Sequence, residues 1–272
     1  MAISLIHISD THNPWHIIKK LQAIKQQYPI DYLLITGDLT NDGDNWQYET
    51  VQRALLIYWD YALGWQNMVL PCPGNHDARK AGIFFWQRES IKRFDKTFNT
   101  KFYGLNKPMV DVFADGKLVS NVVSNGKSNK KSTNCTVTTN HKSRVVLIRL
   151  DSNCEGWNWA LACGKVGWYQ RWVLSNLLDQ YQGYTRIVAL HHHPFDRGLG
   201  HKMLDAKKFM DVVKGRCEVL CFGHKHRFER CYKQEQEYNI RYILAAGAFF
   251  DEPRCHRIVC DNKGLSVNEI LI

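Results

Sequence analysis

The chain has 272 residues, of which 44% are hydrophobic and 23% are charged, a balance typical of a globular protein. Its 36 Lys and Arg residues against 26 Asp and Glu give a net charge of +10, which favours anionic partners without distinguishing a nucleotide from a polymer or a membrane surface. No apolar run approaches the ~18 residues that span a bilayer. One hydrophobic core supports this length, so we expect a single folded domain over residues 1–272.

The first residues and the cysteines both favour a cytoplasmic protein. No basic segment precedes a long apolar stretch at the start of the sequence, so a secretory signal is not expected. The nine cysteines are an odd number and include no C-x-x-C pair, so neither a disulfide framework nor a zinc knuckle is indicated. We therefore expect reduced thiols and a cytoplasmic location.

Short β-rich runs alternate with helical patterns in the first third of the chain. Strands are expected at residues 3–8, 31–36 and 68–70. Helices are expected at residues 14–28 and 44–63, the first from apolar residues at helical spacing after Pro14. This β-α-β-α-β order predicts an α/β core in which helices cover a sheet.

Residues 114–144 differ in composition from the rest of the chain. Their excess of Asn, Ser, Thr, Lys and Gly predicts an exposed polar loop or hairpin insertion, with short strands at 118–123 and 136–138. Six basic residues and one acidic residue lie between positions 115 and 144, so half of the net charge belongs to this segment. The basic character is therefore a local feature.

Regular patterns resume after the insertion. Strands are expected at residues 144–150, 185–190 and 218–222, and helices at 166–178 and 206–213. The last 50 residues predict strands without helices, at 228–232, 240–245, 257–260 and 265–271. Helices among the early strands, and strands alone at the end, predict a two-sheet sandwich flanked by helices.

Metal-ligating side chains follow five of the predicted strands, at the point where each strand ends. The candidates are Asp10, His12, Asp38, Asn75, His76, Asp77, the run His191 to His193, His224 and His226. Ligands bind outside the carboxyl ends of strands in open α/β sheets, so these strand ends predict one shared pocket. Imidazoles mixed with carboxylates suit Mn, Fe, Zn, Ni or Co, whereas Mg and Ca prefer all-oxygen sites. The set exceeds the needs of one ion, so we expect two ions, which together clamp the oxygens of a phosphoryl displacement.

In chain order, the motifs D-x-H, G-D, G-N-H-D, the histidine run and G-H-x-H resemble the five signature blocks of the calcineurin-like metallophosphoesterases. The stretches HISDTH, GDLTNDG, PGNHD, LDS and HHHPF make the chain most similar to the class III cyclic-nucleotide phosphodiesterases and the related glycerophosphodiesterases. The resemblance covers most of the chain but fails in the insertion at 114–144. It implies the family's four-layer α-β-β-α sandwich, with two mixed sheets flanked by helices.

The resemblance also implies a ligand set for two ions. One ion would be held by Asp10, His12, Asp38 and His226. The other would be held by Asp38, Asn75, His192 and His224, with Asp38 bridging. The family's ligand in the histidine run stands two places before the proline, which indicates His192, and His191 is the alternative because a slip of one residue changes the face.

The G-N-H-D motif supplies the remaining implied roles. His76 looks like the family's catalytic histidine, which stabilises charge on the phosphate or protonates the leaving oxygen. Asp77 would orient that imidazole. A metal-bound hydroxide would be the nucleophile, so no protein nucleophile is expected. The histidines outside the motifs, among them His7, His201 and His256, are expected to be packing or surface residues.

These features favour a metal-dependent phosphodiesterase that acts on a small diester or nucleotide, with a 3′,5′-cyclic nucleotide as a candidate substrate. A nuclease is the main alternative because of the basic insertion, and its binding would depend steeply on salt. A phosphomonoesterase on the same fold is a further alternative. A non-catalytic scaffold is the remote one, because all the expected ligands are present in the sequence.

Overall fold

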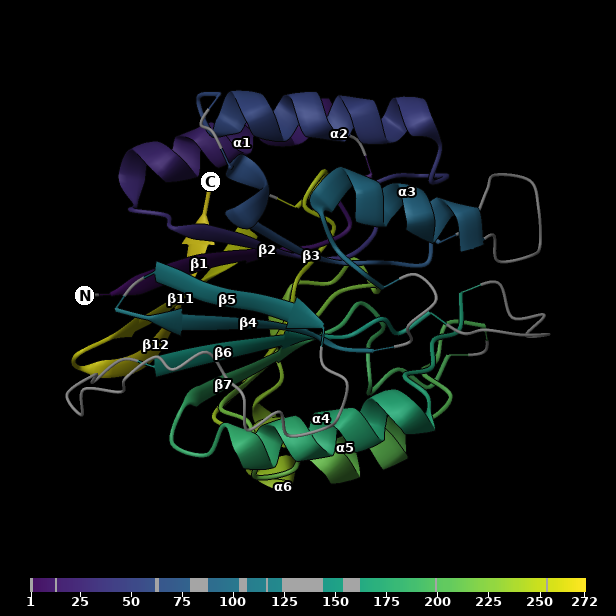
Figure 1. Cartoon of the computed structure of the whole chain (residues 1–272), viewed down its shortest axis with the longest axis vertical. Coiled ribbons are helices and arrows are strands. Elements are labelled where there is room, and N and C mark those ends of the chain that lie inside the picture. Colours follow the sequence, from purple (N-terminus) through teal and green to yellow (C-terminus); the bar gives the residue numbers. More distant parts are fainter. Residues whose placement is uncertain are drawn as a thin grey trace.

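Two mixed β-sheets pack face to face, and helices cover their outer faces (Figure 1). The computed structural model describes residues 2–12, 14–61, 64–78, 88–102, 107–115, 117–123, 144–153, 162–198, 200–252 and 254–272. Within these residues the layers follow the order helices, sheet, sheet, helices. The predicted four-layer α-β-β-α sandwich is therefore confirmed.

The five-stranded sheet combines the two ends of the chain. Its order is β12 (Gly264–Leu271), β11 (Arg254–Asp261), β1 (Ile3–Ile8), β2 (Tyr32–Thr36) and β3 (Val69–Cys72). The strands β1, β2 and β3 are parallel, whereas β11 runs antiparallel to both β1 and β12. The carboxyl ends of the three parallel strands therefore lie at one edge of this sheet.

The seven-stranded sheet uses the middle of the chain. Its order is β5 (Lys117–Val123), β4 (Met109–Ala114), β6 (Arg144–Arg149), β7 (Thr185–Ala189), β8 (Val219–Phe222), β10 (Tyr242–Ala245) and β9 (Glu229–Arg230). The strands β6, β7, β8 and β10 are parallel and form its centre. Antiparallel strands close both edges.

The helices divide between the two outer faces. The five-stranded sheet is covered by α1 (Pro14–Gln27), α2 (Asn45–Tyr58) and α3 (Arg88–Phe98), and the short 3₁₀ helix η1 (Trp65–Asn67) leads into β3. The seven-stranded sheet is covered by α4 (Trp168–Gln180), α5 (Ala206–Val213) and α6 (Tyr232–Tyr238).

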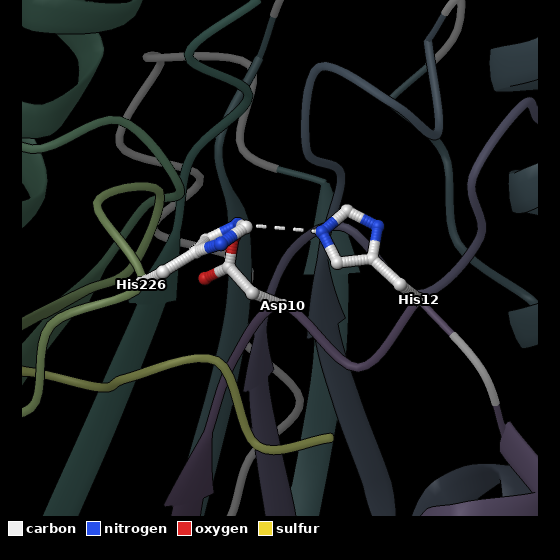
Figure 2. Close-up of side chains that lie close together, drawn as sticks. All are labelled: Asp10, His12 and His226. Carbon is white, nitrogen blue, oxygen red and sulfur yellow. Dashed lines mark hydrogen bonds and ion pairs between the residues drawn. The ribbon is translucent and has the colours of Figure 1, made fainter. Parts of the chain in front are cut away.

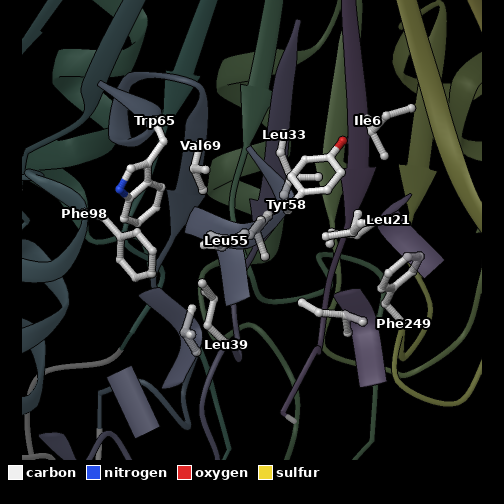
Figure 3. Close-up of a cluster of buried hydrophobic side chains, with 14 of the residues drawn as sticks. Ile6, Leu21, Leu33, Leu39, Leu55, Tyr58, Trp65, Val69, Phe98 and Phe249 are labelled. Carbon is white, nitrogen blue, oxygen red and sulfur yellow. The ribbon is translucent and has the colours of Figure 1, made fainter. Parts of the chain in front are cut away.

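Side-chain alternation along the strands divides the core into layers. On β1, Leu5 faces the other sheet and packs in the cluster that contains Leu147, whereas its neighbour Ile6 faces the helices. Ile6 belongs to the cluster that contains Leu21 of α1 and Leu55 of α2 (Figure 3). A third cluster lies between the seven-stranded sheet and α4 and α5. Each sheet is therefore buried on both faces, which explains why its strands read as apolar runs.

A buried arginine that is paired within the seven-stranded sheet also connects it to β3 of the five-stranded sheet. The guanidinium of Arg149 on β6 donates twice to the carboxylate of Asp111 on β4, at 2.6 and 3.0 Å. Its Nη1 atom also donates to the carbonyl oxygen of Pro71 on β3, at 2.7 Å. Both charged side chains are buried. A paired charge with its hydrogen bonds satisfied can remain in the interior, and here it fixes one sheet against the other.

The structure describes part of the polar segment at 114–144. The expected strand at 118–123 is present as β5, which pairs antiparallel with β4 at the edge of the seven-stranded sheet. Leu118 of this strand packs against the core between the sheets. Residues 116 and 124–143, which carry most of the basic side chains and the expected strand at 136–138, lie outside the described residues.

The prediction that the last 50 residues contain no helix is wrong, because α6 lies between β9 and β10. The sequence of α6 is polar and spans only seven residues, so it lacks the apolar periodicity that marks a longer helix. Glu235 holds it in place by accepting the backbone N–H of Ile243 (2.9 Å) and the guanidinium of Arg230 (2.8 Å). A tertiary contact thus stabilises a helix without a sequence signal.

The seven cysteines among the described residues are all buried and free, while Cys135 and Cys154 lie outside them. Burial raises the pKa of Cys72 and Cys255 to about 12, so these thiols are protonated packing residues. Among the described helices, none has the length and apolar character that a membrane span requires.

Candidate metal centre

The loops that follow β1 and β2 run side by side at the carboxyl edge of the five-stranded sheet. The backbone N–H of Asp10 donates to the carbonyl oxygen of Gly37 (3.0 Å), and that of His12 donates to the carbonyl oxygen of Asp38 (3.1 Å). The loop after β3 joins them, since the N–H of His76 donates to the Asp38 carboxylate (2.8 Å). Three strand ends therefore present their polar side chains to one another.

Two loops from the seven-stranded sheet complete the arrangement. The strands β7 and β8 end just before the histidine run and the G-H-x-H motif. The backbone N–H of Gly223 donates to the carbonyl oxygen of His191 (3.0 Å), and that of His224 donates to the Asp10 carboxylate (2.9 Å). The carboxyl edges of both sheets therefore meet at one site.

Five of the candidate ligands have a left-handed backbone. The positive φ angles are 49° at Asp10, 42° at His12, 52° at Asp38, 77° at His224 and 53° at His226. This region costs a residue with a Cβ atom about 1–2 kcal/mol. Strain of this kind persists where surrounding contacts fix it, and it concentrates at functional sites. Its recurrence at these positions supports a functional role for the strand ends.

The glycines of two motifs allow the close approach of these loops. A Cβ atom on Gly223 would lie 2.6 Å from Oδ2 of Asp10, and one on Gly74 would overlap the carboxylate and backbone nitrogen of Asp38. Both positions therefore require glycine, because any side chain would displace a carboxylate.

Asp10, His12 and His226 form the first donor group (Figure 2). Nε2 of His226 lies 3.3 Å from Oδ1 of Asp10 and 3.4 Å from Nε2 of His12. Oδ2 of Asp10 accepts the backbone N–H of His224, whereas the buried Oδ1 accepts no further hydrogen bond from the described residues. The two imidazole nitrogens share a hydrogen bond, whereas Oδ1 of Asp10 beside them is a buried acceptor without one, although buried acceptors are normally paired.

Asp38, Asn75, His191 and His224 form the second donor group. Nε2 of His191 lies at its centre, 3.3 Å from Oδ2 of Asp38, 3.0 Å from Oδ1 of Asn75 and 3.1 Å from Nδ1 of His224. Asp38 also lies 4.0 Å from Nε2 of His12, so the two donor groups meet at this carboxylate. The side chains of Asp38, Asn75 and His191 are almost completely buried, and that of His224 is partly buried.

Hydrogen bonds to backbone carbonyl oxygens fix the tautomers of two imidazoles in the second donor group. Nδ1 of His191 donates to the carbonyl oxygen of Thr36 (2.7 Å), and Nε2 of His224 donates to that of His201 (3.1 Å). A carbonyl oxygen only accepts, so the opposite nitrogen of each neutral ring carries a lone pair. Four acceptor atoms therefore converge, which is the arrangement that a metal cation requires. An imidazole that is anchored through one nitrogen presents its other nitrogen to such an ion.

The electrostatics of the second donor group are those of a site that attracts a positive charge. Burial alone would lower the pKa of His191, but the charge of Asp38 outweighs burial and raises this pKa to about 9. Burial alone would raise the pKa of Asp38, but His191 holds it well below its usual range. The residues therefore fit a bound cation.

The sequence profile of calcineurin-like phosphoesterases matches residues 3–228. The chain belongs to the calcineurin-like phosphoesterase family. Members of this family are metal-dependent phosphoester hydrolases, and the two donor groups are candidate sites for the metal ions. No curated protein sequence matches the chain.

Solved structures share the calcineurin-like phosphoesterase fold with this chain at low sequence identity. GAP50, described as the anchor in the inner membrane complex of Plasmodium, has a TM-score of 0.63 at 9% identity and covers 99% of this chain and 84% of its own. Purple acid phosphatase PPD1 from yellow lupin has a TM-score of 0.54 at 11% identity, with 100% and 52% covered. The Haemophilus influenzae NAD nucleotidase NadN has a TM-score of 0.53 at 11% identity, with 100% and 50% covered. The chain spans about half the length of the last two, and these likenesses show the fold.

Within the second donor group, His191 makes the contacts that the sequence led us to expect of His192. Nδ1 of His192 is hydrogen-bonded to the Ser152 hydroxyl (2.8 Å), and its Nε2 atom is buried without a hydrogen bond from the described residues. Burial and the neighbouring His224 and His191 hold the pKa of His192 well below its usual value. The ring packs 4.6 Å from that of His224, beside the second donor group. The contacts to Asp38 and Asn75 thus belong to His191, the alternative.

Asp77 and His76 are both at this edge, but the contacts of Asp77 differ from the expected ones. The Asp77 carboxylate accepts the backbone N–H groups of Leu39 and Gly74 and the Thr40 hydroxyl, at 3.0–3.1 Å. It therefore ties the loops after β2 and β3 together. Nδ1 of His76 instead donates to the carbonyl oxygen of Asn41 (2.7 Å). Asp77 can thus orient His76 indirectly, through the loop that ends at Asn41.

A second cluster of possible ligands has different chemistry. His193, Glu229 and Cys231 lie together in the wall of a cavity of about 400 Å³, whose lining includes none of the residues implied as ligands of the two ions. Nδ1 of His193 accepts the backbone N–H of Phe195 (3.2 Å), so the neutral ring carries its proton on Nε2, which faces Glu229 (3.6 Å). A ligating nitrogen must be deprotonated, so in this tautomer Nε2 of His193 offers no lone pair to an ion beside Glu229.

Some of the residues that complete the centre carry no sequence signal. The groups that fix the imidazoles are the carbonyl oxygens of Thr36, Asn41 and His201, and any residue type supplies a carbonyl. The hydroxyl that binds His192 belongs to Ser152, in the L-D-S stretch that contributed to the family resemblance. Only this last residue could have been found from the sequence.

Proposed function

We propose that this chain is a binuclear metal-dependent phosphodiesterase that hydrolyses small phosphodiesters, with two ions sharing Asp38. The observation that carries the proposal is the convergence of two donor groups on this one carboxylate. One ion would be held by Asp10, His12, Asp38 and His226. The other would be held by Asp38, Asn75, His191 and His224.

The donor chemistry supports transition ions. Imidazole, carboxylate and amide groups together suit Mn, Fe, Zn, Ni or Co. When bound, such a pair would activate water at neutral pH and neutralise charge on the phosphoryl oxygens. The protein's part is to fix the donors, and the anchored tautomers of His191 and His224 do this before an ion arrives.

His76 is the residue that would handle a proton. Its Nδ1 atom is held by the carbonyl oxygen of Asn41, and its ring lies 4.8 Å from that of His12. The side chain is half-buried, so solvent and substrate both reach it. As an imidazolium it would present Nε2–H to the leaving oxygen, which is the role of a general acid.

A diester is favoured over a monoester by the charge beside the centre. A diester carries one negative charge, whereas an ionised monoester carries two. Lys225 stands between His224 and His226 in the sequence, but its ammonium group is paired with the Asp196 carboxylate at 2.8 Å. The basic side chain of the G-H-x-H motif is therefore directed to a protein carboxylate, which suits a substrate of lower charge.

The scaffold alternative has to be weighed because one similar fold bears the description of an anchor. The fold by itself does not decide between enzyme and anchor. The donor atoms favour an enzyme, because a scaffold has no need for a buried carboxylate oxygen that lacks a hydrogen bond or for left-handed residues at five ligand positions.

The test is a hydrolysis panel on protein stripped with a chelator and reloaded with Mn²⁺. Its substrates are bis-p-nitrophenyl phosphate, p-nitrophenyl phosphate, a 3′,5′-cyclic nucleotide and DNA. We expect two ions per chain and a higher kcat/KM for the small diester than for the monoester or DNA. Faster hydrolysis of the monoester or of DNA would replace the proposal with the corresponding alternative. Two bound ions without hydrolysis of any substrate would support a scaffold.

A further inference from the structure

Phe250 lies beside the first donor group, on the turn that follows β10. Its ring centroid is 5.7 Å from that of His12 and 6.1 Å from that of His226, and both contacts are edge-to-face. The side chain is nevertheless 37% exposed. Part of the ring therefore rests on two candidate ligands while the remainder faces solvent next to the metal centre.

The backbone of this turn is held rigidly against the end of β1. Nζ of Lys20 donates to the carbonyl oxygens of Phe249 (2.8 Å) and Phe250 (3.0 Å). The N–H of Phe249 donates to the carbonyl oxygen of Ser9 (3.1 Å), the residue before Asp10. These contacts hold the backbone of Phe250 in place before a ligand binds, which reduces the entropy lost on binding.

The core does not need the Phe250 side chain. The neighbouring Phe249 fills the core instead, because it is buried and packs in the cluster with Ile8 and Ile17. Phe250 is absent from all three apolar clusters of buried residues. A ring of this kind is available to a ligand that binds at the centre.

We infer that Phe250 contacts the substrate and receives a planar aromatic group, a nucleobase or an aryl ester, on the side of the phosphate next to His226. The inference rests on the proposed function, since the phosphate must first bind at the donor groups. A ring surrounded by polar imidazoles gives a flat apolar surface with room for offset or edge-to-face packing. Stacking of a base on an aromatic side chain contributes roughly fivefold to a hundredfold in affinity.

The test uses inert phosphonates, so that binding is measured without turnover. Benzylphosphonate, cyclohexylmethylphosphonate and ethylphosphonate carry the same charged group and differ in the apolar part. Calorimetric titration of the Mn²⁺-loaded protein gives their affinities for the wild type and for Phe250→Ala and Phe250→Tyr. Tyr61→Ala serves as a matched control, because Tyr61 is an exposed aromatic residue beyond the far end of α2.

We expect the wild type to bind benzylphosphonate about tenfold or more tightly than ethylphosphonate. Phe250→Ala should remove most of this preference and leave ethylphosphonate binding within about twofold, since it keeps the phosphate site. Phe250→Tyr and Tyr61→Ala should keep the preference. An unchanged preference in Phe250→Ala, or equal affinity for the cyclohexylmethyl and benzyl ligands, would overturn the role of Phe250. Failure of ethylphosphonate to bind the loaded wild type would overturn the proposed function, and the role of Phe250 with it.

Discussion

Nε2 of His191 lies 3.0 Å from Oδ1 of Asn75, although both atoms are acceptors when the imidazole is neutral. Two acceptors at this distance repel each other unless a positive charge lies between or beside them. The pKa of His191 is raised to about 9, chiefly by Asp38 against the effect of burial, so a proton supplies that charge when no ion is bound. A metal ion that binds here takes the place of the proton, which makes His191 central to the predictions below.

Replacing His191 should therefore cost more than replacing His192. His191→Ala removes a nitrogen that faces three other donors, so we expect one ion per chain instead of two and a loss of at least about a hundredfold in kcat/KM. His192→Gln keeps a polar group near Ser152 and should retain both ions, with kcat/KM within about tenfold. Elemental analysis and diester hydrolysis measure both effects. The reverse ranking would restore His192 as the ligand.

Asp38→Asn should disrupt both ion sites at once, because the two donor groups share this carboxylate. We expect fewer than one bound ion per chain and no measurable turnover, even with excess Mn²⁺. Asp196→Asn is the matched control, since Asp196 is a buried carboxylate paired with Lys225 outside the centre. The control should bind two ions. Retention of both ions in Asp38→Asn would contradict a bridging role.

His76→Gln should lower kcat by about 10²- to 10⁴-fold, while metal content stays at two ions. The loss should be smaller for an ester with a p-nitrophenolate leaving group, which departs without protonation, than for an alkyl ester. That difference separates a general acid from a residue that merely positions the substrate. Equal losses for both esters would assign His76 to binding of the phosphate.

The nuclease alternative makes its own prediction for the basic segment. Substitutions in this segment leave the edge strand β5 (Lys117–Val123) in place. Changing Lys127, Lys130, Lys131 and Lys142 together to Gln should leave hydrolysis of a small diester within about tenfold, or roughly 1.4 kcal/mol of barrier. If the enzyme acts on nucleic acid, the same variant should lose DNA or RNA cleavage and show a flatter salt dependence of binding. Loss of both activities would connect the segment to the active site.

The buried His256 should make stability sensitive to acid. Burial lowers its pKa to about 4 from an ordinary 6.5, and its Nε2 donates to the carbonyl oxygen of Ala245 (3.1 Å). The folded protein therefore binds fewer protons than the unfolded chain between these pH values, so the stabilisation present above pH 6.5 is lost as the pH falls. His256→Gln removes the titration but keeps a donor.

Urea unfolding of the metal-free protein measures this effect. Between about pH 7.5 and 5, the wild type should lose about 2 kcal/mol more than His256→Gln, given about 1.4 kcal/mol per unit of pKa difference. Identical slopes for the two proteins would mean that folding does not lower the pKa of His256.

The sequence predicts the layers well because the strands are apolar runs with polar residues at their ends. The bounds of α5 match the prediction, since Phe209, Met210 and Val213 mark a buried face. The helix α3 has a similar face, formed by Ile91, Phe94 and Phe98, but the prediction did not include it. The helix α6 has no such signal, because its position depends on a hydrogen-bonded Glu235.

The candidate metal centre could likewise be predicted from the sequence only in part. The order of motifs along the chain predicts which strand ends carry donors, and the structure brings Asp10, His12, Asp38 and Asn75 together there. The sequence does not show which histidine of the run is the donor, because the three residues are of the same type. The choice depends on the carbonyl oxygen of Thr36, which lies at the end of β2, 155 positions away, and accepts a hydrogen bond from His191. Tertiary contacts of this kind leave no local pattern.

The placement of β11 beside β1 has a consequence for how the protein assembles. Arg257 on β11 donates to Ser4 on β1 across 253 positions of the chain. The contact of Asp10 with His226 likewise joins an early residue to a late one. Contacts so distant in sequence form slowly, because the intervening loop must be closed first. During synthesis on the ribosome, the edge of β1 that pairs with β11 therefore stays unpaired until β11 has been made. We expect ion uptake to follow this closure, so metal added during refolding should raise the yield of native protein and leave the earliest kinetic phase unchanged.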